Sequence, residues 1–212
     1  MLVSNLKFDT SPTEDAVLGP GAWQRSLEEP TITTKDGKTC AYFNGSNSGL
    51  ISTNQYFPNI DVYKDDWMIM VYIYTSINNA AMGIASKWDY NSSSFKPLIL
   101  RDYNGVFKLK GGGSATIPIN QWNLISVVHT AGNINLYLND ILTCTLGEKA
   151  LQADALNSAE SFTIGFIYGL ANNNRFNGYM SDFRIYKDET SIPVSRSELF
   201  DDSDKNYYGV KA

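Results

Sequence analysis

The sequence predicts an all-β protein, an antiparallel jelly-roll β-sandwich with very little helix. Three observations support this fold class: short apolar stretches alternate with turn residues along the chain, a complete β-hairpin occupies residues 121–142, and helical periodicity is scarce. About eleven to thirteen strands at this spacing are typical of a jelly roll.

The hairpin is the most informative segment. Trp122 opens an extended run, residues 130–133 supply a turn, and apolar and polar side chains alternate over residues 134–138. This pattern predicts a hairpin with one buried face, in which Trp122 is substantially buried above Leu136 and Leu138.

The other strands follow from apolar runs between turn residues. Residues 67–74 form a nearly continuous apolar run that predicts a central strand, whereas residues 10–27 are rich in Ser, Pro and Gly and predict a long surface loop. Helix is expected only as short turns at 149–159 and 194–200. Further strands are expected opening at Lys7–Phe8, in two short pieces within 39–52, and at 83–87, 98–101, 106–110, 116–119, 141–146, 161–168 and 179–186.

Three motifs together resemble a known family. Trp122 with the sequence Leu-Tyr-Leu-Asn-Asp at residues 136–140 resembles the hairpin of the laminin-G-like branch of the concanavalin A-like lectin/glucanase superfamily. Residues 41–45 and 176–186 resemble its early strand and its closing strand. Asp140 stands where the family usually has Gly, and Asp tolerates the left-handed backbone that such a turn needs.

The resemblance spans roughly residues 6–200. It implies one concanavalin A-like domain over residues 1–200, followed by a C-terminal extension over residues 201–212. The composition agrees with a single large core, because 43% of the residues are hydrophobic and 13% are aromatic. The resemblance specifies the fold more closely than the function, which has to be argued from sites.

Charge and cysteine content limit the partners. The formal net charge is −5 and basic residues do not cluster, which argues against a nucleic-acid partner. Cys40 and Cys144 lie in separate predicted strands, and either free thiols or a disulfide between them fits the sequence.

The N-terminal residues predict neither export nor membrane insertion. The stretch from Met1 to Asp9 has no basic and apolar signal pattern, and no apolar run approaches the length of a membrane span. A laminin-G-like domain without a signal peptide is the combination expected of a phage structural protein, because lysis releases virions without secretion.

The sequence argues against catalysis. Retaining glycoside hydrolysis needs two carboxylates about 5–5.5 Å apart, and the Glu-x-Asp-x-x-Glu pattern of the related glucanases does not occur. The single histidine, His129, is expected to be structural or on the surface. The alternative is a polysaccharide hydrolase or lyase with an atypical site, in a groove lined by Asp89, Glu160 or Asp182 with Tyr103 and Arg101.

Two loops have the composition of a sugar-binding site. Aromatic rings stack on the C–H faces of sugars, and amides and carboxylates bond the hydroxyls. The candidate glycan-binding residues are Trp88, Asp89, Tyr90, Asn91, Asn173 and Arg175. The alternatives are that Trp88 caps the edge of the sandwich, that the Asn residues serve the loop backbone, and that the loops contact protein in an assembly.

A calcium site is a weaker expectation. Many laminin-G-like and lectin domains hold Ca²⁺ with carboxylate and carbonyl oxygens. Asp9 and Asp182 approach each other if the first and last strands are neighbours; otherwise they are a pair of edge acids.

These observations predict a non-catalytic recognition or structural module, either a phage virion protein (tail fibre, baseplate or capsid decoration) or a protein of another surface assembly. The expected partners are a cell-surface glycan or neighbouring proteins of the assembly, and the expected location is a virion or the cell surface. Tyr207 and Tyr208 are expected to dock the C-terminal extension onto the sandwich or onto an adjacent subunit of an oligomer.

Overall fold

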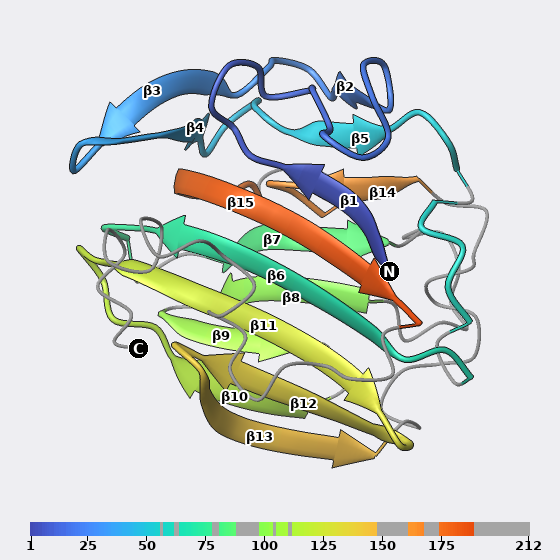
Figure 1. Cartoon of the computed structure of the whole chain (residues 1–212). Helices are drawn as coiled ribbons and strands as arrows, with labels where there is room; N and C mark the ends of the chain where they lie inside the picture. The colour runs from blue at the N-terminus through green and yellow to red at the C-terminus, as the bar shows by residue number, and fades with distance from the viewer. Residues whose placement is uncertain are drawn as a thin grey trace.

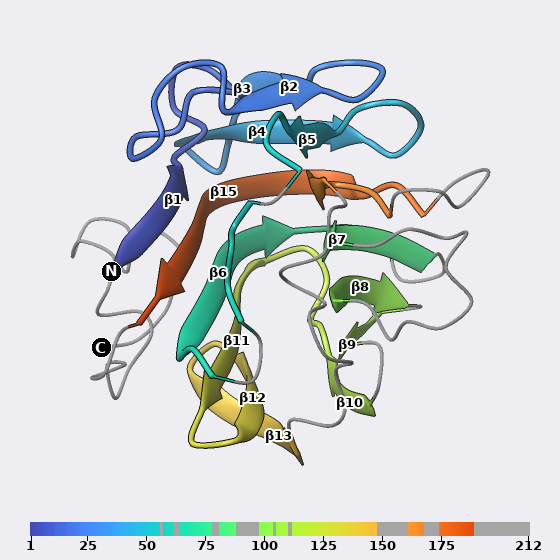
Figure 2. The same ribbon diagram turned by 90° about the vertical axis from the view of Figure 1, so that its right-hand side faces the viewer.

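The described part of the chain is a two-layer β-sandwich. The computed structural model describes residues 1–55, 57–61, 64–77, 81–87, 98–103, 105–109, 112–147, 161–167 and 174–188. Within these ranges fifteen strands form two antiparallel sheets, which Figure 1 shows from the side of one sheet and Figure 2 shows edge-on. The predicted fold class is confirmed. No helix occurs in these ranges, and the two predicted helical turns lie outside them.

The first sheet has eight strands. Its central strand β6 (Trp67–Tyr74) lies between β11 and β15, and β1 (Leu2–Leu6) pairs with β15. Apart from β1, the strands of this sheet lie in the order β13 (Ile141–Gly147), β12 (Asn133–Leu138), β11 (Trp122–Thr130), β6, β15 (Asn177–Lys187), β4 (Lys38–Asn44) and β3 (Thr31–Lys35).

The second sheet has seven strands, and β7 (Ala81–Lys87) is its central strand. The order is β10 (Gly112–Thr116), β9 (Val106–Leu109), β8 (Leu98–Tyr103), β7, β14 (Phe162–Ile164), β5 (Leu50–Ser52) and β2 (Trp23–Arg25).

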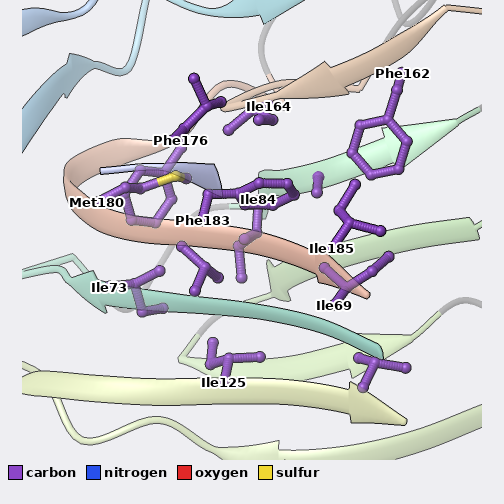
Figure 3. Packing of buried hydrophobic residues seen from close by; sticks show 14 of the residues in the cluster. Ile69, Ile73, Ile84, Ile125, Phe162, Ile164, Phe176, Met180, Phe183 and Ile185 are labelled. Atoms are coloured by element: carbon purple, nitrogen blue, oxygen red, sulfur yellow. The ribbon is translucent and has the colours of Figure 1, made fainter. Parts of the chain in front are cut away.

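The main core lies between the sheets. Side chains alternate along a strand, so every second residue of β6 points toward the opposite sheet. Figure 3 shows inward side chains of the eight-stranded sheet meeting those of the seven-stranded sheet. The labelled members of this core include Ile69, Ile73, Ile125, Phe183 and Ile185 from the first sheet, and Ile84, Phe162 and Ile164 from the second.

The β-hairpin predicted within residues 121–142 is confirmed. Strands β11 and β12 pair in register from Thr130 opposite Asn133 to Ile125 opposite Leu138. Asn139 and Asp140 both have positive φ, at 50° and 62°, so β12 and β13 are joined by a two-residue turn of the primed type. Asp140 therefore adopts the left-handed conformation that was expected of it.

The prediction of a single buried face in the hairpin is wrong. Trp122 is only 6% exposed, as expected, but it lies on the face of β11 opposite to Leu136 and Leu138, which point into the main core. The reason is the strand period of two, because Trp122 shares its face with Leu124 and not with Ile125. Trp122 packs instead against Tyr74 of β6, with ring centroids 5.8 Å apart.

A second group of buried side chains therefore lies on the outer face of the eight-stranded sheet. We call this group the outer cluster. Its members are between 0% and 7% exposed, and they are Cys40, Met68, Met70, Tyr72, Trp122, Leu124, Val128 and Tyr186. Strands β6 and β11 are thus buried on both faces, which explains their nearly continuous apolar sequences.

Other strand predictions need correction. The first strand ends at Leu6, before Lys7–Phe8, because Phe8 has a left-handed φ of 59°. The predicted loop 10–27 contains β2, which pairs with β5, and β3 was not predicted. The strand predicted at 116–119 lies earlier, at Gly112–Thr116, where it pairs with β9; the following Pro118 has no N–H to donate to a ladder.

The cysteines are both free. Cys40 is fully buried in the outer cluster, whereas Cys144 is half-buried and packs against the main core, on the other face of the same sheet. Their strands, β4 and β13, are five positions apart in the sheet, which is roughly 24 Å. A disulfide between them is therefore ruled out in this fold.

Candidate functional site

Most of the predicted glycan-binding residues lie outside the described ranges. These residues are Trp88, Asp89, Tyr90, Asn91 and Asn173. Their role stays a prediction, and the structure describes only the residues that border their two loops. Lys87 precedes the first loop at the end of β7, and Asn174 and Arg175 follow the second.

The borders of the two loops lie at different ends of β7. The N–H of Gly83 donates to the carbonyl of Asn174 at 2.8 Å, which fixes Arg175 beside the beginning of the strand. Lys87 lies four residues further along, about 13 Å away. The described backbone therefore does not bring the borders of the two predicted loops together.

Arg175 is held by a neighbouring turn. One guanidinium nitrogen donates to the carbonyls of Asn47 and Ser48, each at 3.2 Å, and the other lies 3.4 Å from the hydroxyl of Ser26. The guanidinium also lies 4.8 Å from the centre of the Phe166 ring. Burial lowers the pKa of Arg175 from its usual value. These contacts give Arg175 a structural role in the support of the turn.

The turn that Arg175 holds is rich in amides and hydroxyls. The side-chain oxygen of Asn44 accepts hydrogen bonds from the backbone N–H groups of Ser46, Asn47 and Ser48, at 3.0–3.1 Å. The amide nitrogen of Asn44 donates to the carboxylate of Glu28 at 3.0 Å. Asn44 is thus committed to the turn and keeps the adjoining β4–β5 connection in one conformation.

The most distinctive surface feature is a row of four aromatic side chains. Trp122 lies directly opposite Tyr74, Tyr74 opposite Tyr179, and Tyr179 opposite Tyr42, so the row crosses β11, β6, β15 and β4. Neighbouring ring centroids are 5.1–5.8 Å apart. The three tyrosines are half-buried, in contrast to Trp122. We call these four residues the aromatic row.

A charged pair borders the aromatic row. The ammonium of Lys35 lies 4.3 Å from the centre of the Tyr74 ring and 3.0 Å from the carboxylate of Asp36. Hydrogen bonds with Asp36 and Tyr74 raise the pKa of Lys35. Aromatic rings present flat faces to sugar C–H groups, and the adjacent charges offer a donor and an acceptor to hydroxyls. This end of the outer face therefore has the chemistry of a glycan-binding surface.

The aromatic row was not predicted from the sequence. Tyr72 and Tyr74 signal an aromatic face of β6, but Tyr42 and Tyr179 join the row only through the pairing of β4 with β15 and of β15 with β6. That pairing joins segments more than 100 residues apart in the chain. Local patterns carry no information on such register.

The predicted calcium site stays a prediction. The first and last strands do pair, with Leu6 opposite Phe183. However, the carboxylate of Asp182 accepts a hydrogen bond from Ser181 at 3.0 Å and lies 3.6 Å from the guanidinium of Arg184. Asp9 is exposed, and the described ranges contain no group of three or more carboxylate, His or Cys side chains suited to a metal ion.

The residues of the alternative hydrolytic groove belong to different sheets. Asp182 lies in β15 of the eight-stranded sheet, whereas Arg101 and Tyr103 lie in β8 of the seven-stranded sheet. Asp89 and Glu160 lie outside the described residues. Asp182 is 4% exposed and bound to Arg184, which does not suit a carboxylate that must reach a substrate.

His129 has the structural role that was expected. Its ring is 2% exposed and stacks on Trp67, with centroids 5.7 Å apart. Its Nδ1 lies 2.9 Å from the backbone carbonyl of Asp65. These contacts fix the end of β11 against the loop that precedes β6.

Comparison with solved structures shows a similar fold in a domain of an arabinanase and in the binding domain of a mosquitocidal protein. Domain 4 of AbnA, an extracellular GH43 arabinanase from Geobacillus stearothermophilus solved with arabinotriose, is 16% identical, with a TM-score of 0.57 over 88% of this chain and 92% of that one. The binding domain of Paraclostridial Mosquitocidal Protein 1 is 17% identical, with a TM-score of 0.66 over 98% of this chain and 55% of that one.

Part of an enzyme is also similar in fold. A mutant sialidase of Trypanosoma rangeli is 12% identical, with a TM-score of 0.63 over 87% of this chain and 30% of that one. The chain thus spans about half of the mosquitocidal binding domain and less than a third of the sialidase. At these identities the likeness establishes the fold alone.

Sequence comparisons define the family. No curated protein sequence matches the chain significantly. Among the described residues, no helix has the length and hydropathy needed to cross a membrane. A family model described as the concanavalin A-like lectin/glucanases superfamily, of the laminin-G type, matches residues 53–192, about two thirds of the chain. With its lectin-like binding-domain fold, the chain belongs to the concanavalin A-like lectin/glucanase superfamily.

Proposed function

We propose that this protein is a non-catalytic recognition domain that binds a glycan along the aromatic row. The observation that carries the proposal is the alignment of Tyr42, Tyr74 and Tyr179, half-buried and in direct cross-strand contact, beside the Lys35–Asp36 pair. Such a surface offers several ring faces and adjacent polar groups to one oligosaccharide. The arabinotriose complex of the arabinanase domain supports a sugar as the ligand class for this fold.

The proposed setting is outside the cell, on a secreted protein or on a virion. The similar structures are a domain of an extracellular arabinanase and the binding domain of a mosquitocidal protein, which supports a surface role. Within that setting we favour a tail fibre, a baseplate or a capsid decoration of a phage, with neighbouring virion proteins as a second class of partner. The loop residues Trp88, Asp89, Tyr90, Asn91 and Asn173 stay a second predicted surface for such a partner or for the glycan.

A glycan array combined with matched substitutions tests the proposal. Tyr42→Ala and Tyr179→Ala should each weaken binding of an array hit at least about tenfold, because each removes one stacking face. Tyr137→Ala is the control, since Tyr137 is a half-buried tyrosine on the same face but outside the aromatic row. Melting curves confirm that each variant is folded.

The array separates the competing sites. A hit that is insensitive to Tyr42 and Tyr179 but lost on Trp88→Ala would place the glycan in the loop after β7. No hit on a broad array would overturn sugar recognition and leave the assembly role. Pull-down of virion proteins with the full chain would then identify the partner.

The hydrolase or lyase alternative has its own assay. The protein is incubated with β-glucans, alginates and capsular polysaccharides, and reducing ends and unsaturated uronates are measured. We expect no turnover. Activity that disappears on Asp89→Asn, Glu160→Gln or Asp182→Asn would show that the domain is an enzyme.

A further inference from the structure

Two lysines face each other in the β3–β4 hairpin, at the edge of the eight-stranded sheet (Figure 1). Lys35 is the last residue of β3 and lies directly opposite Lys38, the first residue of β4. Asp36 and Gly37 join them with φ of 54° and 87°, which is a two-residue turn of the primed type. Because the turn type fixes the register of a hairpin, the two lysines are held opposite each other.

Both lysines lie on the face of the sheet that carries the aromatic row. The ammonium of Lys35 lies 4.3 Å from the centre of the Tyr74 ring, within the range of a cation–π contact. Directly opposite residues of an antiparallel pair point to the same side, so Lys38 shares this face. The period of two agrees, because Lys38 lies four residues before Tyr42 on β4. Two half-buried cations therefore border the tyrosines.

This arrangement of like charges works against the stability of the hairpin. Cβ atoms of directly opposite residues are only about 4.5–5.5 Å apart, and like charges at such positions repel each other. A lysine on an edge strand can prevent unwanted strand pairing, but that role does not require contact with a tyrosine ring. Local rules of this kind are typically broken at functional sites. The lysine pair is therefore best explained as part of a binding surface.

Asp36 offsets only part of the positive charge. Its carboxylate lies 3.0 Å from the ammonium of Lys35, and its side chain is 51% exposed. An exposed ion pair contributes little because water screens it, so an incoming anion can exchange with Asp36. Residues 35–38 together carry two positive charges and one negative charge.

The charge of the hairpin matters more here than the charge of the whole protein. The chain carries a net charge of −5, which disfavours anionic partners at long range. At physiological ionic strength, however, salt screens exposed charges that are more than about 8 Å apart. A ligand on the Tyr74 ring lies well within that distance of the Lys35 ammonium. An anionic group at this place is therefore attracted by the hairpin.

We propose that the glycan bound along the aromatic row is acidic, and that Lys35 and Lys38 bind its anionic group. A carboxylate or a sulfate ester supplies the charge, because a lysine ammonium binds either one as a compact point charge. The bound anion also relieves the repulsion between the two lysines. This inference rests on the proposed glycan binding and adds the chemical class of the ligand.

Matched pairs of glycans test this class. An array carries sialylated, uronate-containing and sulfated glycans, each beside a neutral glycan with the same backbone. We expect the acidic member of a pair to bind at least about tenfold more tightly than its neutral counterpart. About 1 M salt should remove most of this difference, because the screening length then falls to about 3 Å. Comparison of the carboxylate and sulfate pairs identifies the anionic group.

Substitutions assign the preference to the hairpin. Lys35→Met and Lys38→Met should each reduce the preference for the acidic member at least about threefold, since they remove the charge and keep an unbranched side chain. Lys38→Arg should retain the preference, and Asp36→Asn should increase it by removal of the competing carboxylate. Lys7→Met is the control, because it removes the same charge from an exposed position outside the hairpin. Melting curves check that each variant is folded.

The outcomes separate this inference from the proposed function. Equal or tighter binding of the neutral members, with loss of that binding in Tyr179→Ala, rejects an acidic ligand and leaves glycan binding at the aromatic row intact. A preference for acidic glycans that survives both Lys→Met substitutions places the anion elsewhere and also overturns the inference. If no glycan binds at all, the proposed function is wrong and this inference fails with it.

Discussion

The indole Nε1 of Trp23 donates a hydrogen bond to Oδ2 of Asp15 at 3.1 Å, with both side chains buried. Oδ1 of the same carboxylate accepts backbone N–H groups from Asn5, Val17 and Leu18, at 2.9–3.1 Å. One buried carboxylate thus ties β1, β2 and the turn between them into a single unit. This network fixes the turn at residues 15–18 and the start of β2 against β1.

Substitution of Asp15 should destabilise the protein strongly. Asp15→Ala leaves several buried donors without an acceptor, and each such group costs about 1–3 kcal/mol. We expect a loss of about 3 kcal/mol or more in the free energy of unfolding, measured by urea denaturation. Glu14→Ala is the control, because Glu14 is exposed and precedes the same turn. Equal effects of the two substitutions would contradict this account.

The same carboxylate makes stability depend on pH. Burial acts to raise the pKa of Asp15, but hydrogen bonds from Ser4, Leu18, Asn5 and Val17 outweigh it, and the pKa lies below its ordinary value. The unfolded chain therefore binds more protons, so the contribution of Asp15 is present above about pH 4 and is lost as the pH falls through the folded-state pKa. The stability difference between wild type and Asp15→Asn should shrink below about pH 4 in urea titrations.

Gly165 should not tolerate a side chain. Its φ is +80°, and an added Cβ would overlap the ring of Phe43 in the main core. We expect Gly165→Ala to cost about 2–4 kcal/mol, from backbone strain and from displacement of a packed ring. Gly147→Ala should stay within about 0.5 kcal/mol, because no atom lies within 4 Å of the position that its added Cβ would take. Thermal unfolding of both variants measures the difference.

Trp122→Ala should lower the melting temperature sharply. Loss of a buried Trp costs about 3–5 kcal/mol, which corresponds to a shift of at least about 6 °C for a protein of this size. Trp122→Phe should retain much of the ring contact with Tyr74 and lose less. A shift of only a degree or two for Trp122→Ala would show that the hairpin is peripheral to stability.

Arg175→Lys should loosen the turn at residues 44–48. A lysine cannot reproduce the fork of hydrogen bonds to the carbonyls of Asn47 and Ser48, so we expect a cost of about 1–2 kcal/mol. Hydrogen exchange at the amides of residues 46–48 should accelerate. Arg25→Lys, the same change at an exposed position of β2, should leave both quantities unchanged. Retained protection in Arg175→Lys would assign the order of the turn to Asn44 alone.

Much of the strand pattern could be predicted because it is local. The central strand 67–74, the hairpin around residues 130–133 and the turn at Asn139–Asp140 follow from a period of two and from residues that accept positive φ. The wrong bounds predicted for the first strand and for the strand at 116–119 also have local causes. Phe8 takes a left-handed φ that an aromatic residue rarely adopts, and Pro118 follows its strand instead of lying within it.

The aromatic row could not be predicted from local sequence, because its members come from four strands. The predicted glycan-binding loops stay a prediction, since most of their residues lie outside the described ranges, and Arg175 supports the turn at 44–48. No local sequence pattern indicated the buried hydrogen-bond network of Asp15, because its donors come from β1, from β2 and from its own turn. Such networks depend on which segments meet.

The sequence by itself determined the family, the fold class and most strands, because side-chain alternation and turn chemistry act over a few residues. Only the tertiary structure decided which face of each strand points into the main core and which lies on the outside of the sandwich. Trp122 and Leu136 belong to paired strands but point to opposite faces, since the register of β11 against β12 and β6 fixes both. The alignment of Tyr42, Tyr179 and Tyr74 is likewise nonlocal, because it depends on the register between strands that are far apart in the chain.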